Sequence, residues 1–168
     1  MRTINNINDL NKSDFLSVFG NVFEKTESVA LETFELKPFK DFNDIILKML
    51  NIYEAYEKDK ILEILNSHPE LAVAKKLTSE SKSEQISAKL NECSNEEYEE
   101  FKKLNLEYKK KFKFPFIIAV KGKNKEEILN SFRQRITNNI NLEFEEAKKQ
   151  VKKIASFRLS EIIKINIW

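Results

Sequence analysis

Apolar residues recur every three or four positions along most of this chain, a spacing that predicts α-helices. The clearest apolar face lies on residues 42–53, where it is made by Phe42, Ile45, Ile46, Met49, Leu50 and Tyr53. Further faces predict helices over residues 13–23, 61–65, 81–90, 94–108, 124–136 and 141–163. The chain has only 2 glycines and 3 prolines, too few turn-forming residues for a fold built from many strands.

Polar residues mark where several of these helices begin. Asp41 and Asn124 each precede an apolar face, and their side chains are expected to accept hydrogen bonds from the free backbone N–H groups there. The sequences SKSE (Ser81–Glu84) and SNEE (Ser94–Glu97) match the capping box, in which each side chain bonds the other residue's backbone N–H.

One segment departs from the helical spacing. The sequence FPFIIAVKG is a continuous apolar run with β-branched residues that closes at Gly122, a pattern that favours an extended segment. We therefore predict an all-α fold, a compact bundle of about seven to nine helices with one extended segment near residues 115–121. Because the sequence has no repeats, low-complexity segments or linker, residues 1–168 are expected to form a single domain.

Charge and composition exclude several classes of partner. The 29 basic residues are interspersed with 27 acidic ones, so no basic block of the kind that binds nucleic acid is present. The densest basic run, EYKKKFKF, is expected to be the solvated end of a helix, where cations are stabilised. No apolar run reaches about 18 residues, which predicts no membrane span. Neither end of the sequence carries a recognisable targeting signal, so a cytoplasmic location is expected.

Side chains that ligate metals or act as nucleophiles are scarce. Cys93 and His68 are the one cysteine and the one histidine, so neither an internal disulfide nor a zinc site is expected. The sequence supports no Ser–His–Asp or Cys–His arrangement and no glycine-rich phosphate loop. Candidate chemistry therefore depends on polar residues that interrupt the apolar pattern.

Arg158 lies on the apolar stripe of the last predicted helix, four residues after Ile154 and four before Ile162. A buried guanidinium must be paired, because a buried charge that loses its partner costs about 3–5 kcal/mol. Two interpretations are open. Arg158 either reaches the surface or a structural carboxylate, or it holds an anionic ligand through the two parallel hydrogen bonds that a guanidinium forms.

Glu84 and His68 also carry two interpretations each. The capping box alone explains Glu84, but a helix N-terminus also offers free N–H groups to an anionic or carbonyl oxygen, and Gln85 adds an amide. His68 is expected to end a helix, because Pro69 disfavours helical geometry in the residue before it. His68 is then either a cap or surface residue, or a group for acid–base work near neutral pH.

Taken in order, these residues and their surroundings resemble the OHCU decarboxylases, enzymes of urate breakdown that act on 2-oxo-4-hydroxy-4-carboxy-5-ureidoimidazoline (OHCU). The matching stretches are DFLSVFGNVFE, KPFKDF, HPEL, LTSESKSEQISAKL, LNLEYKKKFKFPFIIAV and VKKIASFRL. They occur in the order of the family and cover nearly the whole chain. A short piece such as HPEL is weak evidence alone, but the ordered set is specific.

The resemblance implies an all-α homodimer that converts OHCU to (S)-allantoin without a cofactor or a metal. It implies His68 as the acid–base residue, Glu84 as a catalytic or substrate-orienting carboxylate, and Arg158 as the residue that holds a substrate anion. The substrate-binding residues that it implies are Pro69, Ser81, Lys82, Ser83, Glu84, Gln85, Phe116, Ile117, Ile118, Ala119 and Val120. Pro69 is expected to end its helix abruptly and so to fix the histidine at the wall of the pocket.

The chain also departs from the family pattern. Glu70 replaces the usual Asp, Val73 stands near a usual glycine, and Lys89 and Lys113 occupy positions usually given to glycine. The loop between Leu71 and Leu77 is shorter than in many relatives. These differences flank the expected site without deleting its polar groups, so they concern the shape of the pocket more than its chemistry.

Two other classes of function compete with the decarboxylase. The chain is alternatively a non-catalytic helical module that binds a small ligand without turnover, or a scaffold in which Arg158, Glu84 and His68 are merely satisfied polar groups. Turnover of OHCU distinguishes the enzyme from the binding module, and a pocket shared by the three residues distinguishes both from the scaffold. The expected partners are the small-molecule substrate and a second copy of the chain.

Overall fold

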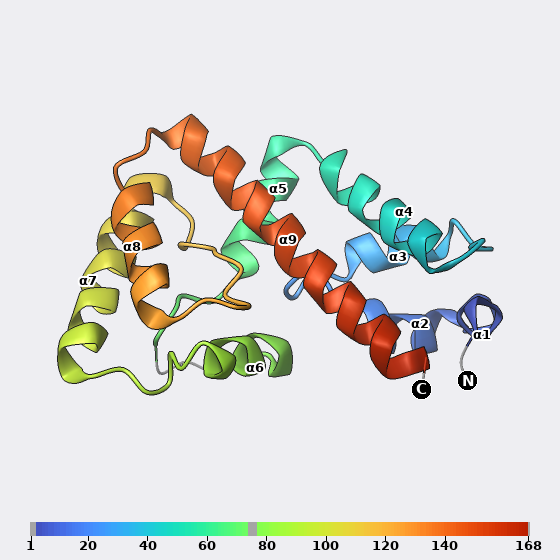
Figure 1. The fold of residues 1–168 in the computed structure, drawn as a ribbon. Helices are drawn as coiled ribbons and strands as arrows, with labels where there is room; N and C mark the ends of the chain where they lie inside the picture. The colour runs from blue at the N-terminus through green and yellow to red at the C-terminus, as the bar shows by residue number, and fades with distance from the viewer. Residues whose placement is uncertain (1–2, 74–76, 168) are drawn as a thin grey trace. The chain divides into compact units, whose positions relative to one another are not determined.

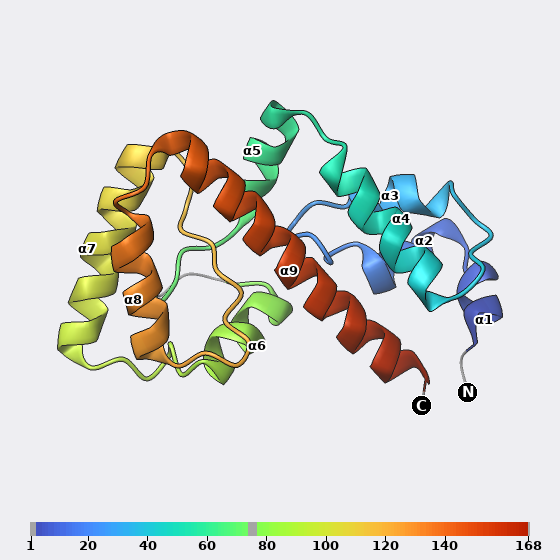
Figure 2. The same cartoon turned by 45° about the horizontal axis from the view of Figure 1, so that its top comes forward.

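The computed structural model describes residues 3–73 and 77–167. Within these residues the chain forms nine helices and no strand, which confirms the all-α prediction (Figure 1, Figure 2). The helices are α1 (Ile4–Asn8), α2 (Lys12–Phe19), α3 (Ser28–Phe34), α4 (Phe42–Glu54), α5 (Lys58–Ser67), α6 (Ser79–Ser87), α7 (Asn95–Phe112), α8 (Lys125–Arg135) and α9 (Ile140–Ile167). The sequence pattern missed α1 and α3, which have 5 and 7 residues and are too short to show a clear helical period.

The chain divides into two compact units. Unit 1 comprises the chain up to Ser67 together with the chain from Lys152 onwards, and unit 2 comprises residues 68–151. Helix α9 therefore contributes its first part to unit 2 and its second part to unit 1. That residues 1–168 act as a single domain stays a prediction.

Helices α2, α3 and α4 form the core of unit 1, where α3 packs against both of the others (Figure 1). Phe15 lies in an aromatic cluster, with its ring centroid 4.7 Å from that of Phe19 and 6.1 Å from that of Phe39. Helix α2 ends at Phe19, so Phe23 lies in the following turn and not on the helix that its spacing predicted. Phe23 is nevertheless buried, with its ring centroid 4.8 Å from that of Tyr53.

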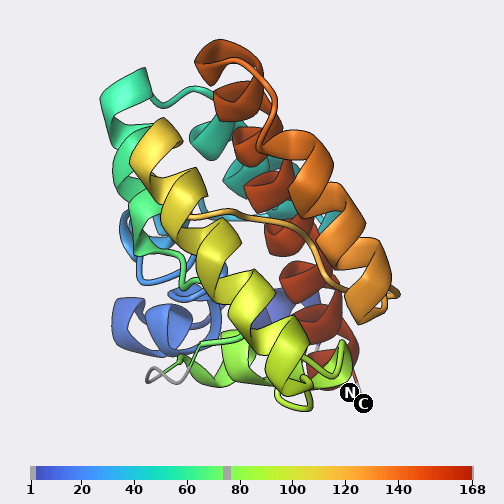
Figure 3. The ribbon, with the colours of Figure 1, turned by 90° about the vertical axis from the view of Figure 1, so that its left-hand side faces the viewer.

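In unit 2 a long connection joins the end of α7 to the start of α8. Helices α7 and α8 run side by side in the same direction, and the chain between them comes back from the end of α7 to the start of α8 (Figure 3). Residues 114–120 of this connection are buried and adopt neither helix nor strand. This arrangement confirms the predicted extended segment.

Three of the predicted helix starts are confirmed. The carboxylate of Asp41 caps α4 by accepting a hydrogen bond from the N–H of Asp44 at 2.8 Å. The side chain of Asn124 caps α8 in the same way, accepting from the N–H of Glu127 at 2.9 Å. The predicted capping box over Ser94–Glu97 is present at the start of α7.

The predicted capping box over Ser81–Glu84 is wrong. Helix α6 begins at Ser79, and its N-cap is Thr78, whose hydroxyl accepts from the N–H of Ser81 at 3.3 Å. Several hydroxyl residues compete for the cap in this stretch, and the earlier start gives the helix additional backbone hydrogen bonds. Glu84 consequently lies in the second turn of α6, where a capping role no longer explains it.

Lys89 and Lys113 both adopt the backbone conformation that favours glycine. Lys113 follows the last residue of α7 with a φ of 67°, and Lys89 follows α6 with a φ of 58°. The Cβ atom of any other residue makes this left-handed region unfavourable. The chain therefore keeps the two turns at which the resemblance leads us to expect glycine, but with strained residues.

Candidate active site

His68 is the first residue after α5 and is followed directly by Pro69. The predicted end of this helix is thus confirmed to within one residue. His68 is buried, with 9% of its surface exposed. His68 is therefore not an exposed surface residue, and its acid–base role stays a prediction.

The loop that begins at His68, residues 68–72, is fixed by a side chain from α6. The amide nitrogen of Gln85 donates to the carbonyl oxygen of Glu70 at 3.2 Å, and its amide oxygen accepts from the N–H of Ala72 at 3.1 Å. Ala72 has a φ of 52°, a conformation that needs such external support in a residue other than glycine. Gln85, predicted as a substrate-binding residue, therefore hydrogen-bonds from α6 to the loop that carries His68.

A second side chain reaches the same loop from α7. Asn105 donates from Nδ2 to the carbonyl oxygen of Leu71 at 2.9 Å, and both residues are buried. Sequence reasoning missed Asn105. The signal that could have revealed it is a polar residue on an apolar helix face, one position after Leu104 and four after Phe101.

The predicted residues of α6 fall into two groups. Ser81 and Gln85, four positions apart on one helix face, are buried, and Glu84 is half-buried. Lys82 and Ser83 are exposed. The side chains of the Ser81–Gln85 stretch therefore do not all point to one place.

The segment Phe116–Val120 is buried throughout and is held along one side. Arg135 donates to the carbonyl oxygen of Ile117 at 2.7 Å, and the N–H of Ala119 donates to the amide oxygen of Gln150 at 2.9 Å. These two contacts fix the backbone on either side of Ile118.

A buried ion pair supports this segment. Glu143 accepts a hydrogen bond from Nε of Arg135 at 2.8 Å and a short one from the hydroxyl of Tyr108. The guanidinium carbon of Arg135 also lies 4.4 Å from the centroid of the Phe116 ring. Burial, and then the hydrogen bond to Glu143, raise the pKa of Tyr108 well above its usual value. Tyr108 thus stays a neutral donor at physiological pH and keeps the network intact.

Arg158 is buried in unit 1 and has a structural carboxylate beside it. Its guanidinium donates to Oε2 of Glu24 at 2.9 Å and to the carbonyl oxygen of Asn21 at 2.9 Å. The side chains of Arg158 and Glu24 are 6% and 0% exposed. The structural-carboxylate interpretation of Arg158 therefore has a definite partner, whereas its role toward a substrate stays a prediction.

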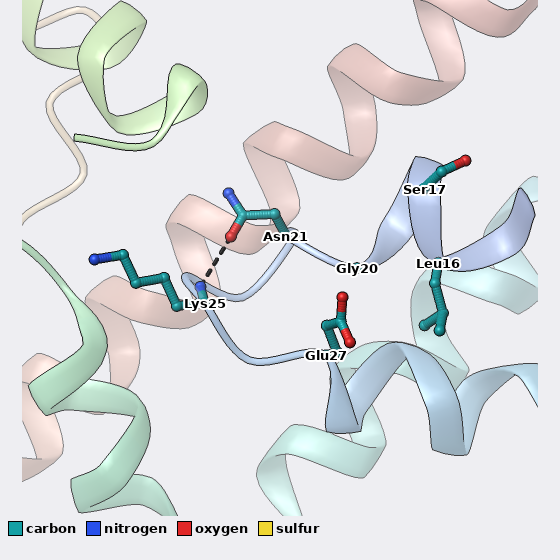
Figure 4. A pocket seen from close by; sticks show the side chains of 6 residues that line it. All are labelled: Leu16, Ser17, Gly20, Asn21, Lys25 and Glu27. Atoms are coloured by element: carbon teal, nitrogen blue, oxygen red, sulfur yellow. Dashed lines mark hydrogen bonds between the residues drawn. The ribbon is translucent and has the colours of Figure 1, made fainter. Parts of the chain in front are cut away.

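Unit 1 also contains an open pocket of about 450 Å³ near the start of the chain (Figure 4). The residues that line it are Leu16, Ser17, Gly20, Asn21, Lys25 and Glu27. The side chain of Asn21 accepts from the backbone N–H of Lys25 at 2.8 Å, which shapes one edge of the pocket. None of the predicted site residues lines this pocket.

Two further observations concern the chain from residue 3 to 73 and from 77 to 167. No group of three or more His, Cys, Asp or Glu side chains in these ranges is arranged to hold a metal ion. None of the helices there combines the length and the apolar character needed to cross a membrane.

Of the departures from the family pattern, the shortened loop between Leu71 and Leu77 includes residues 74–76, which lie outside the described residues.

Comparisons with known proteins identify extensive similarity. The family model for OHCU decarboxylase matches residues 8–160. The uric acid degradation bifunctional protein of Bacillus sp. (strain TB-90) is 37% identical over 98% of this chain, which spans 33% of that relative. The chain therefore spans about a third of the length of that bifunctional protein.

A second relative matches this chain over nearly its own full length. The 2-oxo-4-hydroxy-4-carboxy-5-ureidoimidazoline decarboxylase of Haloferax volcanii is 33% identical over 95% of this chain and 95% of that protein. Among solved structures, (S)-allantoin synthase superposes with a TM-score of 0.73 and 25% identity, over 96% of this chain and 54% of that one. The fold and the sequence thus point to the same group of proteins.

Proposed function

The chain belongs to the OHCU decarboxylase family, and from this premise we propose that it converts OHCU to (S)-allantoin and carbon dioxide. The observation that carries the proposal is the family match over residues 8–160, which includes His68, Glu84 and Arg158. The buried position of His68, in a loop fixed by hydrogen bonds, supports a chemical role for this residue.

The reaction needs no external electron acceptor. When the bond between the ring carbon and the carboxylate breaks, the electron pair moves into the ring and the neighbouring C=N bond accepts it. The ring hydroxyl then becomes a carbonyl, and a proton adds to the carbon that carries the ureido group. We therefore propose catalysis without a cofactor, with the protein holding the substrate anion, orienting the ring and delivering the proton to one face.

The proposed roles follow the chemistry of each side chain. His68 transfers the proton, because its imidazole exchanges protons near neutral pH. Glu84 orients the substrate or its proton donor. Arg158 holds a substrate anion, and its contact with Glu24 keeps the guanidinium plane in a fixed orientation.

The binding segment offers backbone groups to the polar edge of the substrate. Along the chain, the backbone N–H and C=O of Ile118 lie between the two groups that bond to Arg135 and Gln150, and we propose that they face the substrate. A ureido group or a ring amide presents one donor and one acceptor side by side, which complements such a pair. We propose that Phe116–Val120 contacts the substrate in this way, beside Pro69 and the Ser81–Gln85 stretch.

Assembly and location are part of the same proposal. As a member of this family the chain is proposed to form a homodimer and to act in the cytoplasm. Sedimentation that shows only a monomer at tens of micromolar protein contradicts the dimer. The competing function, a module that binds OHCU or allantoin without turnover, predicts ligand binding by calorimetry and no loss of OHCU above its unaided decay.

The direct test is the rate at which freshly generated OHCU disappears with wild-type protein and with His68→Asn. Asparagine keeps the size and an amide but cannot exchange a proton near neutral pH. General acid–base catalysis contributes about 10²–10⁴-fold, so the variant is expected to lose that much rate while circular dichroism still shows a folded helical protein. A folded His68→Asn protein with wild-type rate contradicts the role of His68, and a wild-type protein with no rate above unaided decay contradicts the enzyme.

A further inference from the structure

Asn105 is a polar residue on the buried face of α7, and 4% of its surface is exposed. Its neighbours on that face are large and apolar, among them Phe101 and Tyr108. The Nδ2 atom of Asn105 donates to the carbonyl oxygen of Leu71. Its Oδ1 atom is also buried and accepts no hydrogen bond from any residue that the structure describes. Burying an amide oxygen without a hydrogen bond costs free energy, so packing alone does not explain an asparagine at this position.

The hydrogen bond that Asn105 donates is accepted by a residue of the loop 68–72. Gln85 holds this loop at Glu70 and at Ala72, and Asn105 holds it at Leu71, so three successive residues are tied to helices α6 and α7. Side chains of both helices thus hold the backbone of this loop.

His68 lies only three positions before Leu71, and the intervening Pro69 has a ring-locked φ. Because this connection is short and partly rigid, a shift of Leu71 is expected to shift His68 as well. A displacement of about 1 Å in a reacting group is enough to reduce a rate by about 100-fold. The contact between Asn105 and Leu71 is therefore placed where a small change in the loop moves the imidazole.

We infer that Asn105 is a positioning residue for His68, acting through the carbonyl of Leu71. Its kinetic consequence rests on the proposed decarboxylase function, but its effect on the geometry of His68 does not. The alternative is that Asn105 only satisfies a buried carbonyl and contributes to stability. The two alternatives differ in what they predict for the imidazole.

His68 is the only histidine of the chain, so its ring protons give a single set of histidine signals in NMR spectra. Asn105→Leu keeps the branched shape and the number of heavy atoms but removes the donor. Asn105→Ser is a smaller, polar second variant whose hydroxyl lies one bond closer to the backbone than Nδ2 and so loses the contact with Leu71. The matched control is Thr33→Val in unit 1, which removes another buried hydrogen bond from a side chain to a backbone carbonyl, that of Val29.

In Asn105→Leu or Asn105→Ser we expect the histidine signals and their titration midpoint to shift. We also expect kcat to fall by about 10- to 100-fold with a smaller change in KM. Thr33→Val is expected to lower the melting temperature while leaving the histidine signals and kcat at wild-type values.

Wild-type histidine signals and kcat in both folded Asn105 variants overturn the inference and make Asn105 a stability residue. Shifted signals in a protein whose wild type does not turn OHCU over support the positioning role and contradict the enzyme instead. The failure of one proposal is thus distinguishable from the failure of the other.

Discussion

The guanidinium of Arg158 donates to the carboxylate of Glu24 at 2.9 Å, with both side chains buried in unit 1. The same guanidinium donates from its other terminal nitrogen to the carbonyl of Asn21. A buried guanidinium with two fixed acceptors is a structural element, and its proposed role toward a substrate anion is a separate claim. The two roles of Arg158 are separable by changing its charge partner and its shape independently.

Arg158→Lys keeps the positive charge but loses the planar fork, so it cannot reproduce the contacts to Glu24 and Asn21 together. We expect a modest fall in melting temperature and a larger fall in OHCU turnover. Thermal unfolding and the rate of OHCU loss measure the two effects on the same preparation. A loss of stability with wild-type turnover makes Arg158 a purely structural residue.

Glu24→Gln is the companion variant, because it removes the charge partner and leaves the guanidinium in place. Breaking a buried ion pair on one side destabilises a protein by about 3–5 kcal/mol. We expect denaturant unfolding to show a loss of that order. A loss below about 1 kcal/mol, the size typical of an exposed pair, contradicts the importance of this contact.

Glu84→Gln tests whether Glu84 has a chemical role, since the structure shows that it is not part of a helix cap. Because Glu84 lies in the second turn of α6 and Thr78 is the N-cap, neutralising Glu84 is expected to leave the fold and melting temperature nearly unchanged. Turnover is expected to fall, since the proposed role needs the carboxylate. Glu80→Gln on the same helix is the control, and it should keep wild-type turnover. Equal turnover in the two variants contradicts a chemical role for Glu84.

Lys113→Gly is expected to stabilise the protein, because glycine adopts the φ of 67° without the strain of a Cβ atom. Lys113 is exposed, so little packing is lost on substitution. The expected gain in the free energy of unfolding is about 1 kcal/mol. Lys110→Gly, in the last turn of the same helix, is the control and should destabilise by about 1 kcal/mol. Urea unfolding of both variants measures the difference, and a loss of stability in Lys113→Gly contradicts the strain.

The buried network of Tyr108 and Glu143 predicts a pH dependence of stability. Folding raises the pKa of Tyr108, so below about pH 10 the hydroxyl is protonated in both folded and unfolded states. Above that pH the unfolded chain releases the proton and the folded protein keeps it, so stability is lost as pH rises, by up to about 1.4 kcal/mol per pH unit from this group.

Tyr108→Phe has no proton to release, so its stability should fall less steeply over the same alkaline range. The variant is expected to be less stable than wild type near neutral pH, because Glu143 loses a hydrogen bond, and the gap should narrow above about pH 10. Urea unfolding of both proteins from about pH 8 to about pH 11 makes the comparison. Parallel curves contradict the raised pKa of Tyr108.

The sequence predicted those parts of the fold that depend on local patterns. Helix α4 has a clean apolar face and an Asp41 cap, and the segment Phe116–Val120 has no helical period and many β-branched residues. Helix α6 shows the limit of this reasoning. Thr78 and Ser81 are both acceptable caps, and the choice between them depends on helix length, which the local pattern does not determine.

Contacts between distant residues could not be predicted in this way. Asn105 and Leu71 are 34 positions apart, and Arg158 and Glu24 are 134 positions apart, so no spacing rule connects either pair. The sequence indicated only that Arg158 was a charged residue on an apolar face that needed a partner. Which partner it has is decided by packing of the second part of α9 within unit 1.

The most direct test of the decarboxylase proposal is the optical activity of the product. OHCU decays slowly unaided to racemic allantoin, so the disappearance of OHCU alone does not prove that the protein delivers the proton. Freshly generated OHCU is supplied to the wild-type protein, and both the rate and the enantiomeric excess of allantoin are followed by circular dichroism. The account predicts rapid formation of (S)-allantoin as a single enantiomer, and racemic allantoin formed at the unaided rate contradicts it.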